Sequence, residues 1–191
     1  MADRVEIPSV NEAALRERAA ALEPVALEQI YDAYAGKIYS YLYHRTGDTT
    51  LAEDLCSDVF IRMLEAVSAG RPWNTSLQGW LYRIAHNLII DHYRRQTKRD
   101  GPEVDERWMA PVSYSETFEG LFHSIQLKTA MRFLTEEQRQ VVVLKFVEGL
   151  SNAEVAEILG KTEGAVKALQ HRALSSIRHI VGEEVEDDLD G

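Results

Sequence analysis

The sequence of 191 residues has one cysteine, few prolines and no long apolar run. The single cysteine, Cys56, excludes a disulfide framework and a cysteine-rich zinc site, and it fits a reducing compartment. Cys56 lies in an apolar helical pattern, so we expect a buried, unreactive thiol. No apolar stretch approaches the ~18 residues that a membrane span requires, and the N-terminus lacks the apolar centre of a signal peptide. We therefore expect a cytoplasmic protein without membrane insertion.

Basic residues are scarce as well. The sequence has 21 Lys and Arg against 31 Asp and Glu, which gives a formal net charge of −10. Because attraction to phosphates supplies the sequence-independent part of nucleic-acid affinity, this balance argues against indiscriminate binding to DNA or RNA. The charge is uneven, however: residues 182–191 hold six acids and no base, and the cations gather in two helical stretches. Local basic surfaces on an acidic body suggest a protein that meets DNA with help from a partner.

The clearest local pattern is the stretch 134–181, which predicts three helices joined by two tight turns. The first helix runs to Glu148, and the last two resemble a helix-turn-helix. The predicted helix starts and stops are, in chain order, the capping pair Thr135 and Gln138, the stop at Gly149, the capping box of Ser151 and Glu154, the left-handed turn at Gly160 and the cap at Thr162.

The third of these helices, from Glu163 onward, is locally basic. Residues 161–180 contain four Lys or Arg and one acid, and the cations lie off the apolar stripe. A helix-turn-helix delivers side chains to base edges and phosphates from such a basic helix after a tight turn. A solvated charged face on a helical hairpin explains the same residues equally well, so this stretch alone does not decide the function.

The first half of the sequence predicts further helices. Residues 11–22 predict a short helix that Asn11 caps and Pro24 closes, and we expect it to be an exposed leader. An amphipathic helix follows at 25–45, with Gly36 as a candidate interruption. The pair Thr50 and Glu53 then predicts the cap of another helix.

A polar loop at 70–76 contains Trp73 and precedes a long helix that is predicted to end near Gln96. Residues 80–99 carry five Lys or Arg against one Asp, with aromatic residues between them. Rings that stack on bases, beside cations that follow the backbone, suit a single strand. A basic helix end at the negative pole of the macrodipole explains the cations equally well, but it does not explain Trp73.

Periodicity is lost after this helix, and Gly101, Pro102 and Pro111 indicate a linker in which Trp108 and Met109 are candidates for transient docking. We expect an all-α protein with two small helical domains joined by a flexible linker. The predicted segments are a leader at 1–24, a first domain at 25–97, a linker at 98–119, a second domain at 120–181 that opens with apolar residues at 121–134, and an acidic tail at 182–191. The tail is either a disordered solubilising end or a segment that folds back on Lys167, Arg172 and Arg178.

Four segments carry a resemblance to a known family: 52–64, 79–95, 134–160 and 162–174. Together they resemble bacterial RNA polymerase sigma factors of the extracytoplasmic-function (ECF) type, in the sigma-70 family. The resemblance implies a protein that is not an enzyme, uses no cofactor, and has neither catalytic nor metal-binding residues. It implies that the first domain is region 2 and the second region 4. The implied partners are core RNA polymerase, bound through the clamp helices of its largest subunit, promoter DNA, and an anti-sigma factor.

The resemblance also assigns site residues. The polymerase-binding positions would be Asp54, Leu55, Asp58, Val59, Phe60 and Arg62. The −10 element would be melted and a flipped base held by Trp73, Asn74, Thr75, Ser76, Trp80, Tyr82, Arg83, His86 and Asn87, with Arg94 and Arg95 on phosphates. The −35 element would be read in the major groove by Lys161, Thr162, Glu163, Ala165, Lys167, Gln170, His171 and Arg172. Many relatives carry serine, arginine and leucine where this chain has Ala168, Leu169 and Gln170, a departure that concerns the base contacts and not the fold.

Two other classes of function remain open at this point. A stand-alone helix-turn-helix regulator would bind duplex DNA tightly without polymerase and would have no need of the 52–95 surface. A regulator or adaptor that binds only protein would leave the basic helices without a role.

Overall fold

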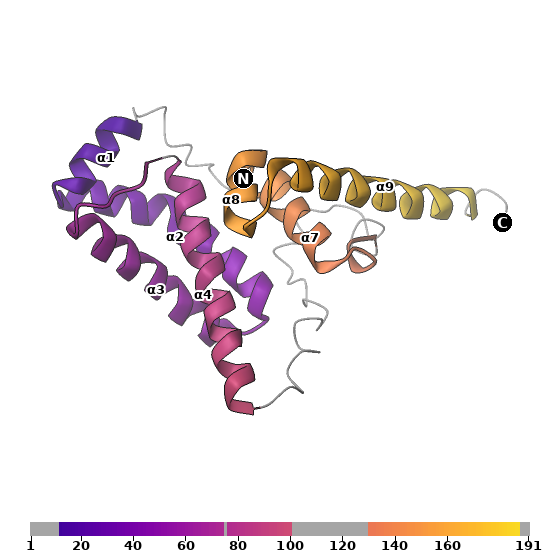
Figure 1. Ribbon diagram of the computed structural model, residues 1–191, viewed down its shortest axis with the longest axis horizontal. Coiled ribbons are helices and arrows are strands. Elements are labelled where there is room, and N and C mark those ends of the chain that lie inside the picture. The colour runs from indigo at the N-terminus through magenta and orange to yellow at the C-terminus, as the bar shows by residue number, and fades with distance from the viewer. Residues whose placement is uncertain (1–11, 75, 101–129, 188–191) are drawn as a thin grey trace. The chain divides into compact units, whose positions relative to one another are not determined.

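The computed structural model describes residues 12–74, 76–100 and 130–187, with 97–100 and 181–187 by their backbone alone. Every regular element in these residues is a helix, which confirms the all-α prediction (Figure 1). The chain forms two compact units, Met1–Val104 and Asp105–Gly191, here called the N-terminal and the C-terminal unit. The predicted linker from 101 onward, with Trp108 and Met109, lies outside the described residues, as do positions 121–129 of the predicted second domain.

The N-terminal unit consists of α1 (Glu12–Ala20), α2 (Pro24–Thr46), α3 (Thr49–Ser68) and α4 (Leu77–Asp100). Helices α2, α3 and α4 pack against one another in pairs, and α1 packs against α2 and α3 (Figure 1). Ile38 of α2, Val59 of α3 and Leu81 of α4 are completely buried where these helices meet. Each such side chain contributes about 1.5–3 kcal/mol relative to an exposed one, so this core defines the unit.

Three helix limits in this unit differ from the prediction. Helix α2 continues through Gly36 without interruption, because a single glycine costs only about 1 kcal/mol and the packed helix offsets it. Helix α3 starts one residue before Thr50: the Asp48 side chain accepts a hydrogen bond from the Leu51 N–H at 3.0 Å, so the predicted Thr50–Glu53 cap is wrong. Helix α4 continues to Asp100, beyond the predicted end near Gln96.

The prediction of an exposed leader is also wrong. In α1, Leu15 and Ala19 are buried. The helix ends at Ala20, and Leu22 then adopts a left-handed conformation with φ 56°. Pro24 does not close α1 but occupies the start of α2, where a missing N–H costs no helical hydrogen bond. The predicted cap at Asn11 lies outside the described residues.

The expectation of a buried Cys56 thiol is confirmed. Its Sγ lies 3.7 Å from the Ala35 carbonyl oxygen, to which it donates a hydrogen bond. Burial raises the pKa of the Cys56 thiol, which disfavours the reactive thiolate.

The C-terminal unit consists of α7 (Glu136–Val142), the π-helical turn η2 (Val143–Val147), α8 (Asn152–Leu159) and α9 (Glu163–Asp187). The predicted starts and stops of these helices are confirmed. The capping boxes of Thr135 with Gln138 and of Ser151 with Glu154 are both formed, Gly149 and Gly160 have φ of 72° and 61°, and the Thr162 side chain accepts from the Ala165 N–H at 3.2 Å. Sequence reasoning did not foresee that the second half of the first helix would be π-helical.

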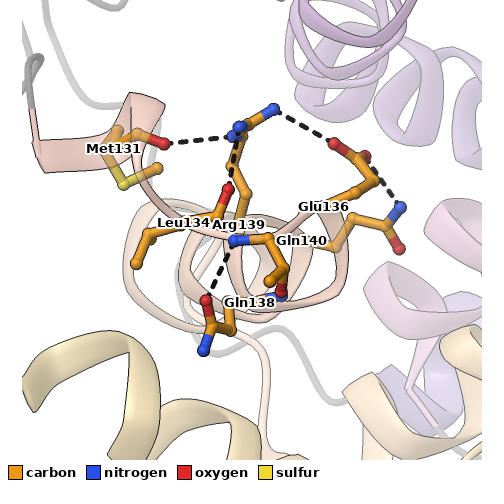
Figure 2. Close-up of polar contacts among 7 residues, drawn as sticks. Met131, Leu134, Glu136, Gln138, Arg139 and Gln140 are labelled. Atoms are coloured by element: carbon orange, nitrogen blue, oxygen red, sulfur yellow. Dashed lines mark hydrogen bonds and ion pairs between the residues drawn. The ribbon is translucent and has the colours of Figure 1, made fainter. Parts of the chain in front are cut away.

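Arg139 fastens α7 to the residues before it (Figure 2). Its guanidinium donates to the carbonyl oxygens of Met131 at 3.2 Å and Leu134 at 3.0 Å, and to the Glu136 carboxylate at 3.2 Å. The planar fork suits several acceptors at once. Met131 and Leu134 pack with Ala173 of α9 in one buried cluster. Arg139 therefore holds in place Met131 and Leu134, which pack against α9.

Helix α9 continues well past the predicted end of its domain. It runs to Asp187, and Figure 1 shows its C-terminal part extending beyond α7 and α8. The expectation of a disordered tail from residue 182 is therefore wrong up to Asp187. The alternative that these acids fold back on the basic part of the helix is also contradicted there, since the backbone continues straight on as helix.

Candidate nucleic-acid interfaces

Helix α9 presents an exposed polar face opposite its core stripe. Val166, Leu169 and Ala173 are buried. Of the predicted −35 residues, the exposed ones are Thr162, Glu163, Ala165, Lys167, His171 and Arg172. The left-handed Gly160 ends α8 and allows the chain to turn into α9 at once. The structure thus presents a helix-turn-helix with cations on its open face.

Two predicted −35 residues are less accessible than these. Gln170 is half-buried at the edge of the core stripe. Lys161 donates from Nζ to the Glu137 carboxylate at 2.6 Å, which joins the turn to the first turn of α7. Because exposed ion pairs contribute only about 0–1 kcal/mol, a DNA phosphate can replace Glu137 as the partner of Lys161.

Four of the predicted −10 residues lie in the core of the N-terminal unit: Trp73, Trp80, Tyr82 and His86. The Trp73 and Trp80 rings stack with centroids 5.8 Å apart, and Tyr82 meets Tyr41 edge-on at 5.3 Å. In the sequence, Trp73 looked functional because a tryptophan in a polar loop has no apolar neighbour to pack against. The structure provides that packing from other elements. The Trp73 ring supports the loop from inside and is not presented to solvent.

The remaining described −10 residues lie on the surface or close to it. Asn74, Asn87, Arg94 and Arg95 are exposed, and Arg83 and Ser76 are half-buried. Arg83, Asn87 and Arg94 follow one another at spacings of four and seven residues, which places them on one face of α4. Thr75 lies outside the described residues. This side of α4 therefore carries two cations, Arg83 and Arg94, beside Asn87, and the exposed Asn74 lies in the loop that precedes the helix.

The start of α4 is held by two side chains. The Ser76 hydroxyl accepts from the Gly79 N–H at 3.1 Å. The Leu77 N–H, at the first position of the helix, donates to the Glu12 carboxylate of α1 at 2.5 Å. Sequence reasoning missed Glu12, because a contact across 65 positions leaves no local signal.

The predicted polymerase residues on α3 divide between surface and core. Asp54 and Asp58 are exposed and Arg62 is half-buried, whereas Leu55, Val59 and Phe60 are buried. Two apolar side chains of the same helix, Ile61 and Leu64, are 51% and 38% exposed. Ile61 follows Asp54 and Asp58 by seven and three positions, so it shares their face. The outer face of α3 is therefore both acidic and apolar.

A groove of about 520 Å³ between α3 and α4 brings two of the predicted surfaces together. Asp58 and Arg62 line it from α3, and Asp91, His92 and Arg95 line it from α4. Polymerase-binding and phosphate-binding candidates thus lie on opposite walls of one groove.

His86 is neutral at physiological pH. Burial, and to a smaller extent the positive charge of Arg45, lowers the pKa of His86 to about 4. Its Nδ1 lies 3.2 Å from the Tyr41 hydroxyl in a buried hydrogen bond. The predicted contact of His86 with DNA would therefore come from an uncharged side chain.

Within residues 12–74, 76–96 and 130–180, whose side chains are described, no three or more His, Cys, Asp or Glu side chains gather as a possible metal site. The helices in the same ranges include none with the length and apolar character of a membrane span.

Comparison with known proteins identifies both units. The family described as Sigma-70 region 2 matches residues 30–99, and Sigma-70, region 4 matches residues 124–177. The ECF RNA polymerase sigma factor SigX of Bacillus subtilis is 31% identical over 83% of this chain and 87% of its own length. The chain belongs to the ECF sigma factors.

Another relative of this sigma factor is the ECF RNA polymerase sigma factor BldN of Streptomyces coelicolor. It is 34% identical over 89% of this chain, which spans 66% of its length. A solved structure of CnrH, in complex with the cytosolic domain of CnrY, is 20% identical, with a TM-score of 0.58 over 89% of this chain and 96% of that one. That likeness supports the fold.

Proposed function

We propose that this sigma factor binds core RNA polymerase and directs it to a subset of promoters, where it recognises the −35 duplex and melts the −10 element. The observation that carries the proposal is the pair of region matches, one within each unit and in the order 2 then 4. A stand-alone helix-turn-helix regulator would need only the second region, so the match at 30–99 favours the sigma factor. The domain limits 25–97 and 120–181 remain part of the proposal.

The C-terminal unit would read the −35 element. Lys167, His171 and Arg172 are exposed on the open face of α9. Thr162 caps the helix, and Glu163 and Ala165 lie in its first turn, where a recognition helix meets base edges. Lys161 would exchange its bond to Glu137 for a phosphate. Gln170 would act at the margin of the interface, because it is half-buried.

The N-terminal unit would open the −10 element. Asn74, Arg83 and Asn87 would contact the melted strand, and Arg94 and Arg95 would bind its phosphates. Ser76 would belong to the same surface, and Thr75 stays a candidate −10 residue by its position in the sequence. Because Trp73, Trp80, Tyr82 and His86 are buried, they would frame this surface rather than stack on bases.

The outer face of α3 would dock on the clamp helices of the largest polymerase subunit. Asp54, Asp58 and Arg62 would supply the polar contacts, with Ile61 and Leu64 as the apolar ones. Leu55, Val59 and Phe60 would hold this face in place from beneath.

The remaining parts of the proposal follow from the family. The protein would catalyse no reaction itself, since the polymerase makes the RNA. It would act in the cytoplasm, where polymerase and promoter DNA meet. An anti-sigma factor would be its regulatory partner.

Open-complex formation by bacterial core polymerase on a promoter library, with and without this protein, tests the proposal. We expect promoter-selective melting only when both proteins are present. Arg172→Ala should weaken the −35 interaction about tenfold, the range for one lost base contact. Arg178→Ala, which removes the same charge further along the exposed side of α9, is the matched control and should change it less. Tight duplex binding by the free protein, without any dependence on polymerase, would contradict the proposal.

A further inference from the structure

One carboxylate connects three segments of the N-terminal unit. Oε1 of Glu12, in α1, accepts a hydrogen bond from the Trp73 indole N–H at 3.1 Å and another from the Leu77 backbone N–H at 2.5 Å. Trp73 belongs to the 70–76 loop, and Leu77 is the first residue of α4. Glu12 therefore joins α1, the loop and α4 at a single point.

The rest of α1 is anchored, so Glu12 is held in place. Leu15 and Ala19 are buried against the unit. Arg18 donates to both carboxylate oxygens of Glu23, each at 2.7 Å, and reaches Gln29 of α2 at 3.5 Å. A bidentate Arg–carboxylate contact fixes the relative orientation of the two side chains as well as their distance. The C-terminal end of α1 is thus attached to α2, while its first residue, Glu12, meets the loop.

The two hydrogen bonds to Glu12 provide acceptors for the Trp73 indole N–H and the Leu77 backbone N–H. The N–H groups in the first turn of a helix lack helical partners, and a carboxylate there is favoured by the helix dipole. The Ser76 hydroxyl accepts from the Gly79 N–H, and the Leu77 N–H donates to the Glu12 carboxylate instead. The Trp73 ring is 2% exposed, and its N–H would lose its acceptor if Glu12 were removed.

We propose that Glu12 is a positioning residue for promoter melting. By bonding to Trp73 and Leu77, it fixes the residues on either side of Asn74 so that Asn74 is presented to the −10 strand, without touching DNA itself. Helix α1 then contributes to promoter melting by the N-terminal unit. This proposal rests on the proposed function.

The test uses the full-length protein with core polymerase and a promoter that carries a fluorescent base in its −10 element. Glu12→Ala should slow open-complex formation roughly tenfold, the effect of losing about one charge-assisted hydrogen bond. Affinity for a −35 duplex should stay the same within about twofold, because the C-terminal unit is unchanged. Glu17→Ala is the matched control: it removes the same charge from an exposed position of the same helix and should leave both measurements unchanged.

Two further measurements separate positioning from a general loss of stability. The amide oxygen of Glu12→Gln has two lone pairs and can accept both bonds, so this variant should recover melting to within about threefold of the wild type. In protein labelled with 5-fluorotryptophan, the Trp73 fluorine resonance should move in Glu12→Ala and stay in place in Glu12→Gln and Glu17→Ala. Trp73→Phe identifies that resonance.

Several results would overturn the inference. These are promoter melting by Glu12→Ala at the wild-type rate, an equal loss in Glu17→Ala, and an impairment that matches the unfolded fraction measured by circular dichroism. A Glu12→Ala protein that does not fold would also overturn the inference, because Glu12 would then be required for folding. If the wild-type protein fails to start transcription at all, the proposed function falls, whereas the Trp73 resonance still reports whether Glu12 holds the loop.

Discussion

Two buried histidines make the stability of the N-terminal unit sensitive to acid. Burial lowers the pKa of His44 and of His86 to about 4 from the ordinary 6.5. The folded state thus releases protons that the unfolded state keeps between pH 6.5 and 4. Stability is complete above pH 6.5 and falls as the pH drops through this window, by up to about 1.4 kcal/mol per pH unit for each histidine.

His86→Gln should remove one of these two contributions. The amide retains a polar group for Tyr41, so stability at pH 7.5 should change little. Between pH 7.5 and 5 the variant should lose up to about 2 kcal/mol less than the wild type. Unfolding followed by the fluorescence of Trp73 and Trp80 measures the difference, with His171→Gln on the exposed face of α9 as the control. Equal losses in His86→Gln and in the wild type would show that His86 does not carry this dependence.

The Lys161–Glu137 bond gives a second prediction at this scale. If Lys161 must leave Glu137 to bind a phosphate, then Glu137→Ala should raise affinity for the −35 duplex about two- to fivefold, the value of one exposed ion pair. Titration of a labelled duplex measures the gain. In a Lys161→Ala background the gain should disappear. Should it persist there, Glu137 would act on DNA through long-range repulsion instead.

At the scale of elements, the outer face of α3 allows a matched comparison. Ile61 and Val25 are each 51% exposed, but only Ile61 lies beside Asp54 and Asp58. Ile61→Asp should therefore lower affinity for core polymerase by about tenfold or more, as expected for an apolar contact at the centre of an interface. Val25→Asp should leave it unchanged.

Affinity can be measured by competition for core polymerase, and thermal unfolding should show that both variants stay folded. A similar loss of affinity in the two variants would place the polymerase contact elsewhere than α3.

Local signals explain which helix limits could be predicted. Ser151, Gly160 and Thr162 act within a few residues of themselves, and the structure confirms all three. The start of α3 was missed because Asp48 and Thr50 are both good caps, and only the structure shows which one accepts from Leu51. Helical spacing alone also does not predict that Ile61 and Leu64 are exposed, because it does not reveal how many neighbours a helix has.

The candidate −10 surface shows the corresponding limit for function. Its composition, aromatic rings among cations, predicted stacking on bases. The structure buries Trp73 and Trp80 against each other and places the Trp73 N–H on a carboxylate 61 positions away. Sequence reasoning located the right loop and helix but could not distinguish rings that support the surface from residues that form it.

At the scale of the whole molecule, the continuous helix α9 separates the acidic end from the basic face. Glu183 follows Arg172 by eleven residues, about 16 Å along a helix axis. Because the Debye length is about 8 Å at physiological salt, these charges are largely screened from each other.

Deletion of residues 183–191 should therefore leave −35 duplex affinity unchanged at 0.15 M salt and raise it only slightly at low salt. A salt titration of the full-length and shortened proteins measures this. A marked rise in affinity at physiological salt, with a steeper salt dependence, would revive the idea that the tail folds back.

The inert Cys56 has a practical consequence for spectroscopy. Since the chain has no other cysteine and this thiol is buried with a raised pKa, a thiol-reactive dye will attach only to cysteines introduced at exposed sites. A pair at Glu17 and Arg178 would place one fluorophore on each unit without any background substitution. Energy transfer between the two dyes could then follow how the distance between the units changes as polymerase and promoter are added.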